Sequence, residues 1–245
     1  MVKTHANKIF SALKHCVILF TAILFCNKLY AQNDKGKSAA SLPEPRDIKV
    51  LNEYKDGKGN IVRVIQYHQG TELITETAII PLKTDINTRI RINPDTLNKD
   101  SILVIVNKSK YNLEVYYRRR IIRSYKAVFG PKPLENKVME GDRRTPEGWF
   151  TIKNKNPNSR YDKFMGITYP NDSDIARFNL LKAKGALPKT ARIGGDVGIH
   201  GIWKGADDMI DKGVGWTDGC IALKNKDIDE LYTLVGVGTR VYIHK

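Results

Sequence analysis

The chain has 245 residues, and its 41 lysines and arginines outnumber 26 acidic residues to give a formal net charge of +15. This balance favours an anionic neighbour, which is nucleic acid, a membrane surface or a cell wall. The C-terminal stretch of roughly 145 residues is long enough for one domain with its own core.

The first 31 residues have the three-part layout of a secretory signal. A basic stretch without acids, 1–15, precedes an apolar run, 16–26, and Ala31 is a small residue before a plausible cleavage point. The apolar run has 11 residues, fewer than the roughly 20 that span a bilayer. We therefore predict a cleaved signal over 1–31 and no stable membrane span afterwards, with a retained anchor as the alternative.

Cleavage would place the mature chain across the inner membrane, most simply in the periplasm. It would remove four lysines, lowering the formal charge to about +11, and two of the three cysteines, leaving Cys220. One cysteine forms no internal disulfide, so the fold relies on its core. A single thiol in an exported protein is either a reactive group or an inert side chain, and the cysteine count leaves both open. Export also argues against nucleic acid as the anionic partner.

Residues 32–47 are rich in small, polar and proline residues, which predicts a linker. The next segment, 48–70, has two branched, partly alternating runs around the sequence DGKGN, which predicts a β-hairpin with glycines in the turn. Residues 71–82 add another strand-like run. We therefore predict a small β-rich N-terminal region over residues 48–98, a candidate for a separate subdomain.

Residues 99–245 hold many short, branched and aromatic runs separated by turn residues. The basic stretch 116–126 is interpreted as two strands around a solvated turn, with anion binding as the alternative. Caps and apolar periodicity predict helices over 171–185 and 225–236. Many short strands with few helices favour a mainly β sandwich or barrel. The predicted strands lie within 102–109, 112–118, 121–130, 141–153 and 238–245.

His200 lies at the end of a strand-like run, and Cys220 follows it by twenty residues. A thiol at its ordinary pKa of roughly 8.5 is only a few per cent thiolate at neutral pH, so a nucleophilic cysteine needs a group that accepts its proton. We predict that His200 is this group, because His68 lies in the N-terminal hairpin and His244 is the penultimate residue.

Gly219 directly precedes the predicted nucleophile. Without a side chain, the backbone there can turn sharply and approach a substrate closely. Backbone N–H groups of residues 218–220 would then converge on a developing oxyanion. The alternative is an ordinary flexible loop.

The sequence His200–Gly201, fifteen further residues, then Thr217–Asp218–Gly219–Cys220 resembles the signature of the L,D-transpeptidase catalytic domain of the YkuD type. The resemblance covers roughly residues 101–245 and includes the stretches KSKYNLEVYY, GDRRTPEGWF and GTRVYI. The form WTDGCIAL, with ITYPND upstream, is similar to the YafK-like branch of that family.

The resemblance implies an L,D-transpeptidase-type β-sandwich with a few short helices as the catalytic domain, residues 99–245. It implies that Cys220 attacks a stem peptide of peptidoglycan, with His200 as the base and the backbone carbonyl of Gly201 orienting the imidazole. Two positions depart from the pattern of many members. Asp218 bears on the oxyanion region, and Ala222 bears on substrate contacts and on whether cross-linking is the reaction.

The reaction implied by the resemblance has two acyl transfers and needs no metal or organic cofactor. Cys220 displaces a terminal D-amino acid and forms a thioester, which an amine from a neighbouring stem resolves. Hydrolysis is the alternative at the same site, either trimming stem peptides or releasing a wall-attached lipoprotein. A non-catalytic wall-binding protein is the third option, and it predicts that Cys220 resists alkylation at neutral pH, whereas an enzyme predicts rapid labelling.

Further residues are candidates for oxyanion or substrate binding. A loop over 203–216 is expected to shape the entrance of the site, and its acids are interpreted as solvated rather than metal-binding because they lack the usual ligand spacing. Trp203 and Arg144 are secondary candidates for lining that entrance or meeting a stem carboxylate. The main candidates are Thr217, Asp218, Gly219, Trp216 and Arg192.

Overall fold

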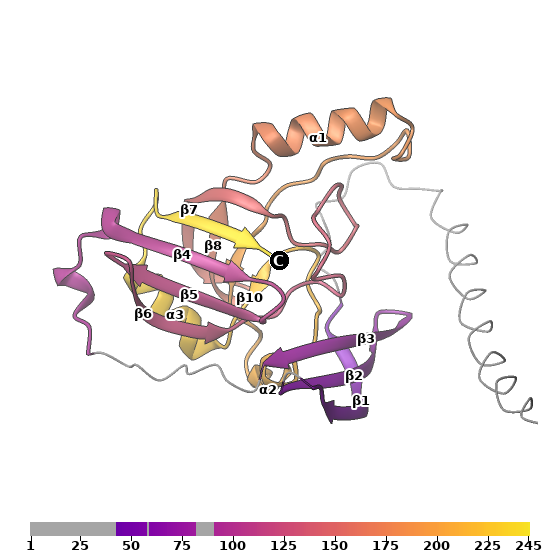
Figure 1. The fold of residues 1–245 in the computed structure, drawn as a ribbon, viewed down its shortest axis with the longest axis horizontal. Coiled ribbons are helices and arrows are strands. Elements are labelled where there is room, and N and C mark those ends of the chain that lie inside the picture. The colour runs from indigo at the N-terminus through magenta and orange to yellow at the C-terminus, as the bar shows by residue number, and fades with distance from the viewer. Residues whose placement is uncertain (1–42, 58, 82–90) are drawn as a thin grey trace, which may run out of the picture. The chain divides into compact units, whose positions relative to one another are not determined.

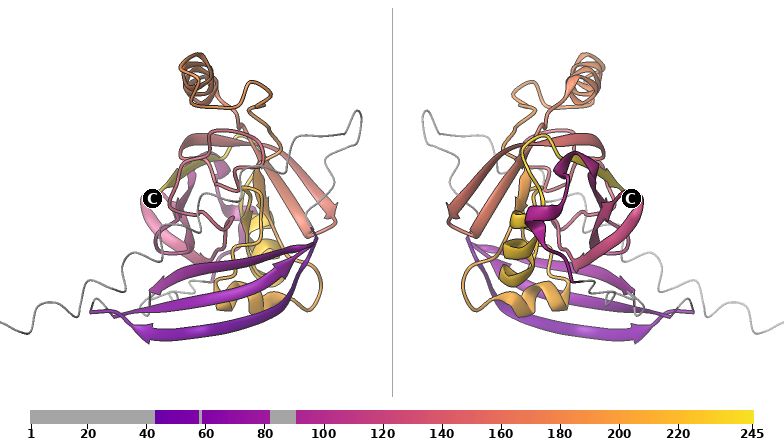
Figure 2. Two further views of the ribbon diagram at one scale, coloured as in Figure 1. Left: turned by 90° about the vertical axis from the view of Figure 1, so that its right-hand side faces the viewer. Right: turned by 90° about the vertical axis from the view of Figure 1, so that its left-hand side faces the viewer.

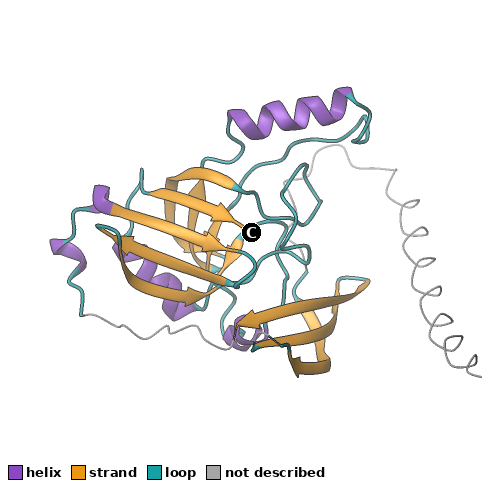
Figure 3. Cartoon of the chain, in the orientation of Figure 1, coloured by secondary structure: helices purple, strands orange, loops and turns teal. Residues whose placement is uncertain are grey.

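Strands dominate the fold and form a three-stranded and an eight-stranded sheet (Figure 3). The computed structural model describes residues 43–57, 59–81 and 91–245, all within one unit of the chain, residues 42–245. The predicted signal and most of the predicted linker lie outside the described residues. No helix in these described ranges is long and apolar enough to cross a membrane.

The three-stranded sheet comes from the N-terminal part of the described chain. Its strands β1 (Pro45–Lys55), β2 (Asn60–Gln69) and β3 (Glu72–Pro81) pair antiparallel in that order. The predicted hairpin is confirmed, and its turn is held by the backbone N–H of Asn60, which donates to Asp56 Oδ1 at 2.8 Å. Because β1 begins at Pro45, the end of the predicted linker is part of a strand.

The eight-stranded sheet has the order β10-β9-β8-β7-β11-β4-β5-β6. Its neighbours pair antiparallel, except that β11 pairs with β4 and β9 pairs with β10 in parallel. A bridge between Val128 and Ala222 links the chain after β6 to β10, so the two edges of the sheet meet. In Figure 1, β4, β5 and β6 lie in front of β8 and β10. The strands are β4 (Ile102–Asn107), β5 (Asn112–Tyr117), β6 (Arg120–Lys126), β7 (Gly148–Ser159), β8 (Asp162–Ile167), β9 (Gly198–His200), β10 (Ile221–Ala222) and β11 (Arg240–His244).

Both predicted helices are confirmed as α1 (Asp172–Ala183) and α3 (Asn225–Leu234). A capping box between Asn171 and Asp174 starts α1, because each side chain accepts a hydrogen bond from the other residue's backbone N–H. Two short 3-10 helices, η1 (Pro94–Thr96) and η2 (Lys99–Ser101), precede β4.

The predicted loop over 203–216 is wrong in its middle, where α2 (Asp207–Lys212) forms. Six residues are too few to carry a helical period in the sequence, and the helix ends at Gly213 in the left-handed conformation. Arg63 of β2 donates through Nη1 to the carbonyls of Asp211 and Lys212, so the three-stranded sheet lies against the end of α2 (Figure 2).

One hydrophobic core joins the two sheets. Alternate residues of β4 point inward, and Val104 and Val106 are fully buried. Ile65, Tyr67 and Ala78 of the three-stranded sheet belong to the same cluster of buried residues. The N-terminal sheet therefore shares its core with the rest of the described chain and has no separate core of its own.

Candidate active site

The end of β9 and the start of β10 bring His200 and Cys220 to one face of the sheet. The two strands pair in parallel, with Ala222 beside His200 and Ile221 beside Ile199. Paired residues point to the same face, and so do residues two apart on one strand. Extending this register by one residue sets Cys220 beside Gly198, on the face to which His200 points. Residues two apart are separated by roughly 7 Å along a strand, a gap across which a thiol and an imidazole can approach.

The imidazole of His200 is buried, with 3% of its surface exposed, and one nitrogen is already engaged. Its Nδ1 lies 2.7 Å from the carbonyl oxygen of Gly201. Because a carbonyl only accepts hydrogen bonds, Nδ1 carries the proton of the neutral ring, and Nε2 keeps its lone pair. Burial lowers the pKa of His200 to about 4, although the hydrogen bond to Gly201 acts in the opposite direction. The ring is therefore neutral at neutral pH.

Aromatic side chains fix the plane of this ring. Tyr161 stacks on His200 with 5.1 Å between ring centroids, and Trp216 meets it edge-on at 5.4 Å. Gly201 permits the close packing behind the ring, since a Cβ there would lie 2.5 Å from Asn225 Oδ1 and 2.8 Å from the carbonyl oxygen of Tyr161.

The thiol of Cys220 is half-buried and donates to a backbone carbonyl. Its Sγ lies 3.6 Å from the carbonyl oxygen of Asp196. Burial raises the pKa of Cys220 to about 11, and this effect exceeds the opposing effects of the Gly198 backbone and the Lys137 ammonium. The resting thiol is therefore protonated, and it must leave the Asp196 carbonyl to reach His200.

Thr217 sets the shape of the turn that carries the thiol. Its hydroxyl donates to the carbonyl of Cys220 at 2.7 Å and accepts from the backbone N–H of Gly219 at 3.3 Å. At Gly219 φ is +140°, and a Cβ would lie 2.5 Å from the carbonyl oxygen of Arg144, so only glycine fits. One of the three amides predicted to form the oxyanion site, that of Gly219, is thus engaged within the turn.

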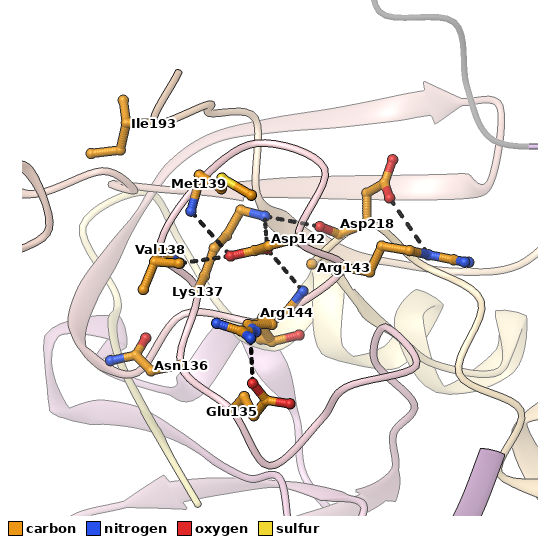
Figure 4. A network of polar contacts seen from close by, with 12 residues as sticks. Glu135, Asn136, Lys137, Val138, Met139, Asp142, Arg143, Arg144, Ile193 and Asp218 are labelled. Carbon is orange, nitrogen blue, oxygen red and sulfur yellow. Dashed lines mark hydrogen bonds and ion pairs between the residues drawn. The ribbon is translucent and has the colours of Figure 1, made fainter. Parts of the chain in front are cut away.

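A buried ion pair, which the sequence analysis missed, supports this turn from outside (Figure 4). Lys137 Nζ lies 2.8 Å from Asp142 Oδ1 and donates to the carbonyl of Asp218 at 3.1 Å. Asp142 in turn accepts from the backbone N–H groups of Val138 and Met139. Asp142 lies in the stretch GDRRTPEGWF, whereas nothing in the sequence around Lys137 marks it as buried.

The match to known proteins identifies the family. The family model described as "YkuD: L,D-transpeptidase catalytic domain" matches residues 101–243, more than half of the chain. The chain belongs to the L,D-transpeptidase family. The match contains both His200 and Cys220, begins after the three-stranded sheet, and confirms the resemblance inferred from the signature.

Individual L,D-transpeptidase relatives share about a third or less of their aligned residues with this chain. The chain is 32% identical over 142 residues to "Putative L,D-transpeptidase YqjB" of Bacillus subtilis (strain 168), covering 57% of this chain and 69% of that protein. It is 27% identical over 141 residues to "Putative L,D-transpeptidase YafK" of Escherichia coli (strain K12), covering 55% of this chain. The chain spans about half of YafK, 47% of its length.

Solved structures are similar at lower identity. An L,D-transpeptidase from Mycobacterium smegmatis is 12% identical to this chain, with a TM-score of 0.39. The alignment covers 81% of this chain and 82% of the M. smegmatis chain. Bd1075 of Bdellovibrio bacteriovorus is 20% identical to this chain, with a TM-score of 0.40. The alignment covers 59% of this chain and 48% of the Bd1075 chain.

The aromatic and arginine candidates of the sequence analysis lie in different surroundings. Trp216 is buried between His200 and Trp203, so it packs against the imidazole instead of lining an open entrance. Arg192 is 81% exposed on its side chain and forms an ion pair with Glu140, with 3.0 Å between Nε and Oε2. Arg144 forms an ion pair with Glu135.

The remaining polar candidates also have partners in the described chain. Asp218 Oδ1 lies 3.9 Å from Arg143 Nε, and burial raises the pKa of this carboxyl group. In α2 and beside it, Asp207 accepts from the backbone N–H of Asn225 and Asp211 pairs with Lys224. These α2 carboxylates therefore serve local hydrogen bonds and ion pairs. Within the described ranges, no group of three or more histidine, cysteine, aspartate or glutamate side chains has the geometry to hold a metal ion.

Proposed function

We propose that this L,D-transpeptidase family member forms a thioester between Cys220 and a peptidoglycan stem peptide and transfers the acyl group to an amine. The observation that carries the proposal is the hydrogen bond from His200 Nδ1 to the Gly201 carbonyl. That bond leaves Nε2 as a base, and extending the pairing of β9 and β10 by one residue places Cys220 beside Gly198, on the sheet face to which His200 points. The family acts on peptidoglycan, which supports this substrate class.

In the first transfer, His200 acts as a general base on a neutral thiol. The pKa of Cys220 is raised to about 11 and that of His200 is lowered to about 4, so a preformed thiolate–imidazolium pair is disfavoured in the resting site. Nε2 accepts the Sγ proton as sulfur attacks the carbonyl carbon before the terminal D-residue. The bond to that residue breaks, and its amine takes the proton from the imidazolium. A thioester on Cys220 remains.

In the second transfer, the acceptor amine gives its proton to Nε2 as it attacks the thioester carbonyl. The new amide forms, the carbon–sulfur bond breaks, and sulfur regains the proton from the imidazolium. The Gly201 carbonyl holds the ring in the same orientation through both steps, because the proton moves only at Nε2. Backbone amides at 218–220 remain the proposed oxyanion donors, with Gly219 the least available because Thr217 engages it.

The proposed place of action is outside the cytoplasm, where peptidoglycan lies. Residues 1–31 have the layout of a secretory signal, which supports export to the periplasm. The formal net charge of about +11 that remains without residues 1–31 suits an anionic wall environment.

The decisive experiment incubates the purified protein with muropeptides that carry tetrapeptide stems and weighs the products and the intact protein. Transpeptidation gives dimers that lack one terminal D-residue, together with an acyl adduct on Cys220. Shortened monomers alone would assign stem-peptide hydrolysis to the same site, and release of an attached lipoprotein from wall material would assign the other form of hydrolysis. The absence of any product and any adduct would refute the catalytic proposal.

Variants test the two roles. Cys220→Ala should abolish the adduct, and His200→Gln should lower the rate of adduct formation by roughly 10²–10⁴. His68→Gln is the matched control, because His68 is exposed and contacts Asp47 in the three-stranded sheet. The alkylation contrast expected from the sequence does not separate the options, since a thiol with a raised pKa labels slowly at neutral pH in an enzyme as well.

A further inference from the structure

Three side chains of the N-terminal sheet contact the backbone just ahead of the nucleophile. Tyr67 donates its hydroxyl proton to the carbonyl of Gly215 at 2.6 Å, and Gln69 Nε2 donates to the carbonyl of Trp216 at 2.9 Å. The backbone N–H of Gly215 donates to Glu76 Oε1 at 2.6 Å. Both polar groups of residue 215 are therefore bound by side chains that lie about 140 residues away in the sequence.

The strand register presents these three side chains on one face. Ile65, Tyr67 and Gln69 are each two residues apart on β2, so their side chains point to one face. Glu76 of β3 pairs with Ile65 and therefore points to the same face. Tyr67 is fully buried and Ile65 lies in the core, so the face that carries the contacts is the inward one. Gly215 lets the segment approach this face closely, because a Cβ there would lie 2.7 Å from Glu76 Oε2 and 3.0 Å from the carbonyl oxygen of Gly130.

The bound segment leads directly into both halves of the candidate active site. The ring of Trp216 packs edge-on against His200, with 5.4 Å between centroids. The next residue, Thr217, holds the carbonyl of Cys220 through its hydroxyl. A shift of the backbone at 215–216 would therefore move the wall of the imidazole and the turn of the thiol together.

A second connection runs through Arg143. Its guanidinium contacts Gln69 Oε1, lies 3.6 Å from Glu72 Oε2 and lies 3.9 Å from Asp218 Oδ1. The same sheet is thus linked to the residue that follows Thr217 in the nucleophile's turn.

We propose that the three-stranded sheet is a positioning part of the active centre, in which Tyr67, Gln69 and Glu76 hold residues 215–216 and so set Cys220 and His200 relative to each other. This inference rests on the proposed function of Cys220 and deepens it. The sheet lies outside the segment that matches the family model, so the proposed support comes from residues that precede the matched domain.

The chemistry of Glu76 agrees with a retained role at this position. Burial raises the pKa of Glu76 to about 7, against the hydrogen bond from Gly215 and the positive charge of Arg143, which act in the opposite direction. The other titratable groups that face it, Tyr67 and Tyr111, are buried neutral phenols. Burying a carboxyl group lowers the free energy of unfolding, whereas burying an apolar side chain does not. The hydrogen bond from the backbone N–H of Gly215 offsets part of this cost at Glu76.

The test compares Tyr67→Phe and Glu76→Ala with Thr75→Ala in the full-length protein. Thr75 is the matched control because it precedes Glu76 on β3, is exposed, and accepts a hydrogen bond from the side chain of Gln66, away from residues 215–216. Each variant is measured for kcat and KM with tetrapeptide muropeptides, and for melting temperature. The rate of Cys220 alkylation is followed against pH through the mass of tryptic peptide 213–224.

Positioning predicts that Tyr67→Phe and Glu76→Ala lower kcat at least tenfold with little change in KM. Their alkylation rate at about pH 8 should rise roughly tenfold, as the loosened turn lets the thiol pKa fall towards its ordinary value. Glu76→Gln keeps the acceptor and should restore most of what Glu76→Ala loses. Thr75→Ala should behave as the unchanged protein.

Folded Tyr67→Phe and Glu76→Ala proteins with unchanged kcat and unchanged alkylation would overturn the inference and leave the sheet a packing element only. Tyr67→Phe removes one oxygen atom, so it keeps the test decisive if Glu76→Ala fails to fold. If the unchanged protein turns over no muropeptide, the proposed function fails, while the alkylation comparison still decides the positioning role.

Discussion

Replacing Glu76 by glutamine should change how the stability of the protein depends on pH. Burial raises the pKa of Glu76 from 4.5 to about 7 and lowers the pKa of His200 from 6.5 to about 4. The raised carboxyl pKa means that the folded state is penalised once Glu76 ionises, so its stability falls as pH rises from about 4.5 to 7. The lowered imidazole pKa has the opposite sign, because stability falls as pH drops from about 6.5 to 4.

The two shifts are similar in size. Each pKa unit corresponds to about 1.4 kcal/mol, so each group contributes roughly 3 kcal/mol across nearly the same pH window. Their effects therefore cancel in the unchanged protein. In Glu76→Gln only the His200 effect remains, and the free energy of unfolding of this variant, relative to the unchanged protein, should drop by roughly 3 kcal/mol between about pH 7.5 and 4.5.

The assay is thermal or urea unfolding of both proteins at a series of pH values. For a chain of this length, roughly 3 kcal/mol corresponds to a relative change in melting temperature of about 6–12 °C. Other carboxylates contribute equally to both proteins, so the difference between them isolates Glu76. His200→Gln should give the opposite trend, becoming relatively more stable on acidification. Parallel curves for Glu76→Gln and the unchanged protein would refute the buried, near-neutral carboxyl.

Three further outcomes are expected. Gly219→Ala places a Cβ 2.5 Å from the carbonyl oxygen of Arg144 at φ +140°. It should lower the free energy of unfolding in urea by about 1–3 kcal/mol and the turnover at least tenfold. Gly57→Ala, with open space around the added Cβ, should change neither quantity. Lys137→Met leaves the buried Asp142 carboxylate without its ammonium partner and should cost about 3–5 kcal/mol, part of which Lys137→Met/Asp142→Asn recovers; an unchanged melting temperature would contradict this. The acid limb of kcat/KM should lie near pH 4 instead of 6.5, because burial lowers the pKa of His200, and a limb near 6.5 would show a solvated imidazole.

The elements that the sequence predicts well are those with a local pattern. The branched apolar run ILVIVN marks β4. Helix α3 repeats apolar residues every three to four positions, so Ile228 and Leu231 face the core. The short helix α2 has no such period. A signal for it does exist, since twenty residues separate His200 from Cys220, and parallel strands such as β9 and β10 need a crossover of about that length, usually helical.

The parts of the site that the sequence does not predict depend on distant partners. Lys137 is a lysine buried to 3% exposure, against the usual behaviour of its residue type, because Asp142 and the Asp218 carbonyl both bind its ammonium. No spacing along the chain brings Tyr67 to Gly215, which are 148 residues apart. The signature therefore predicts which residues react, while the residues that hold them emerge only from the fold.

The segment that matches the family model does not contain the whole hydrophobic core. The match begins at residue 101, yet Ile65, Tyr67 and Ala78 contribute to the same buried cluster as β4. Removing the three-stranded sheet would expose that part of the core and would also leave the backbone polar groups of Gly215 without the side chains that bind them. The apolar and the polar contacts that would be lost both lie next to the turn that carries Cys220. The stability of the fold and the geometry of the site are therefore coupled through this sheet.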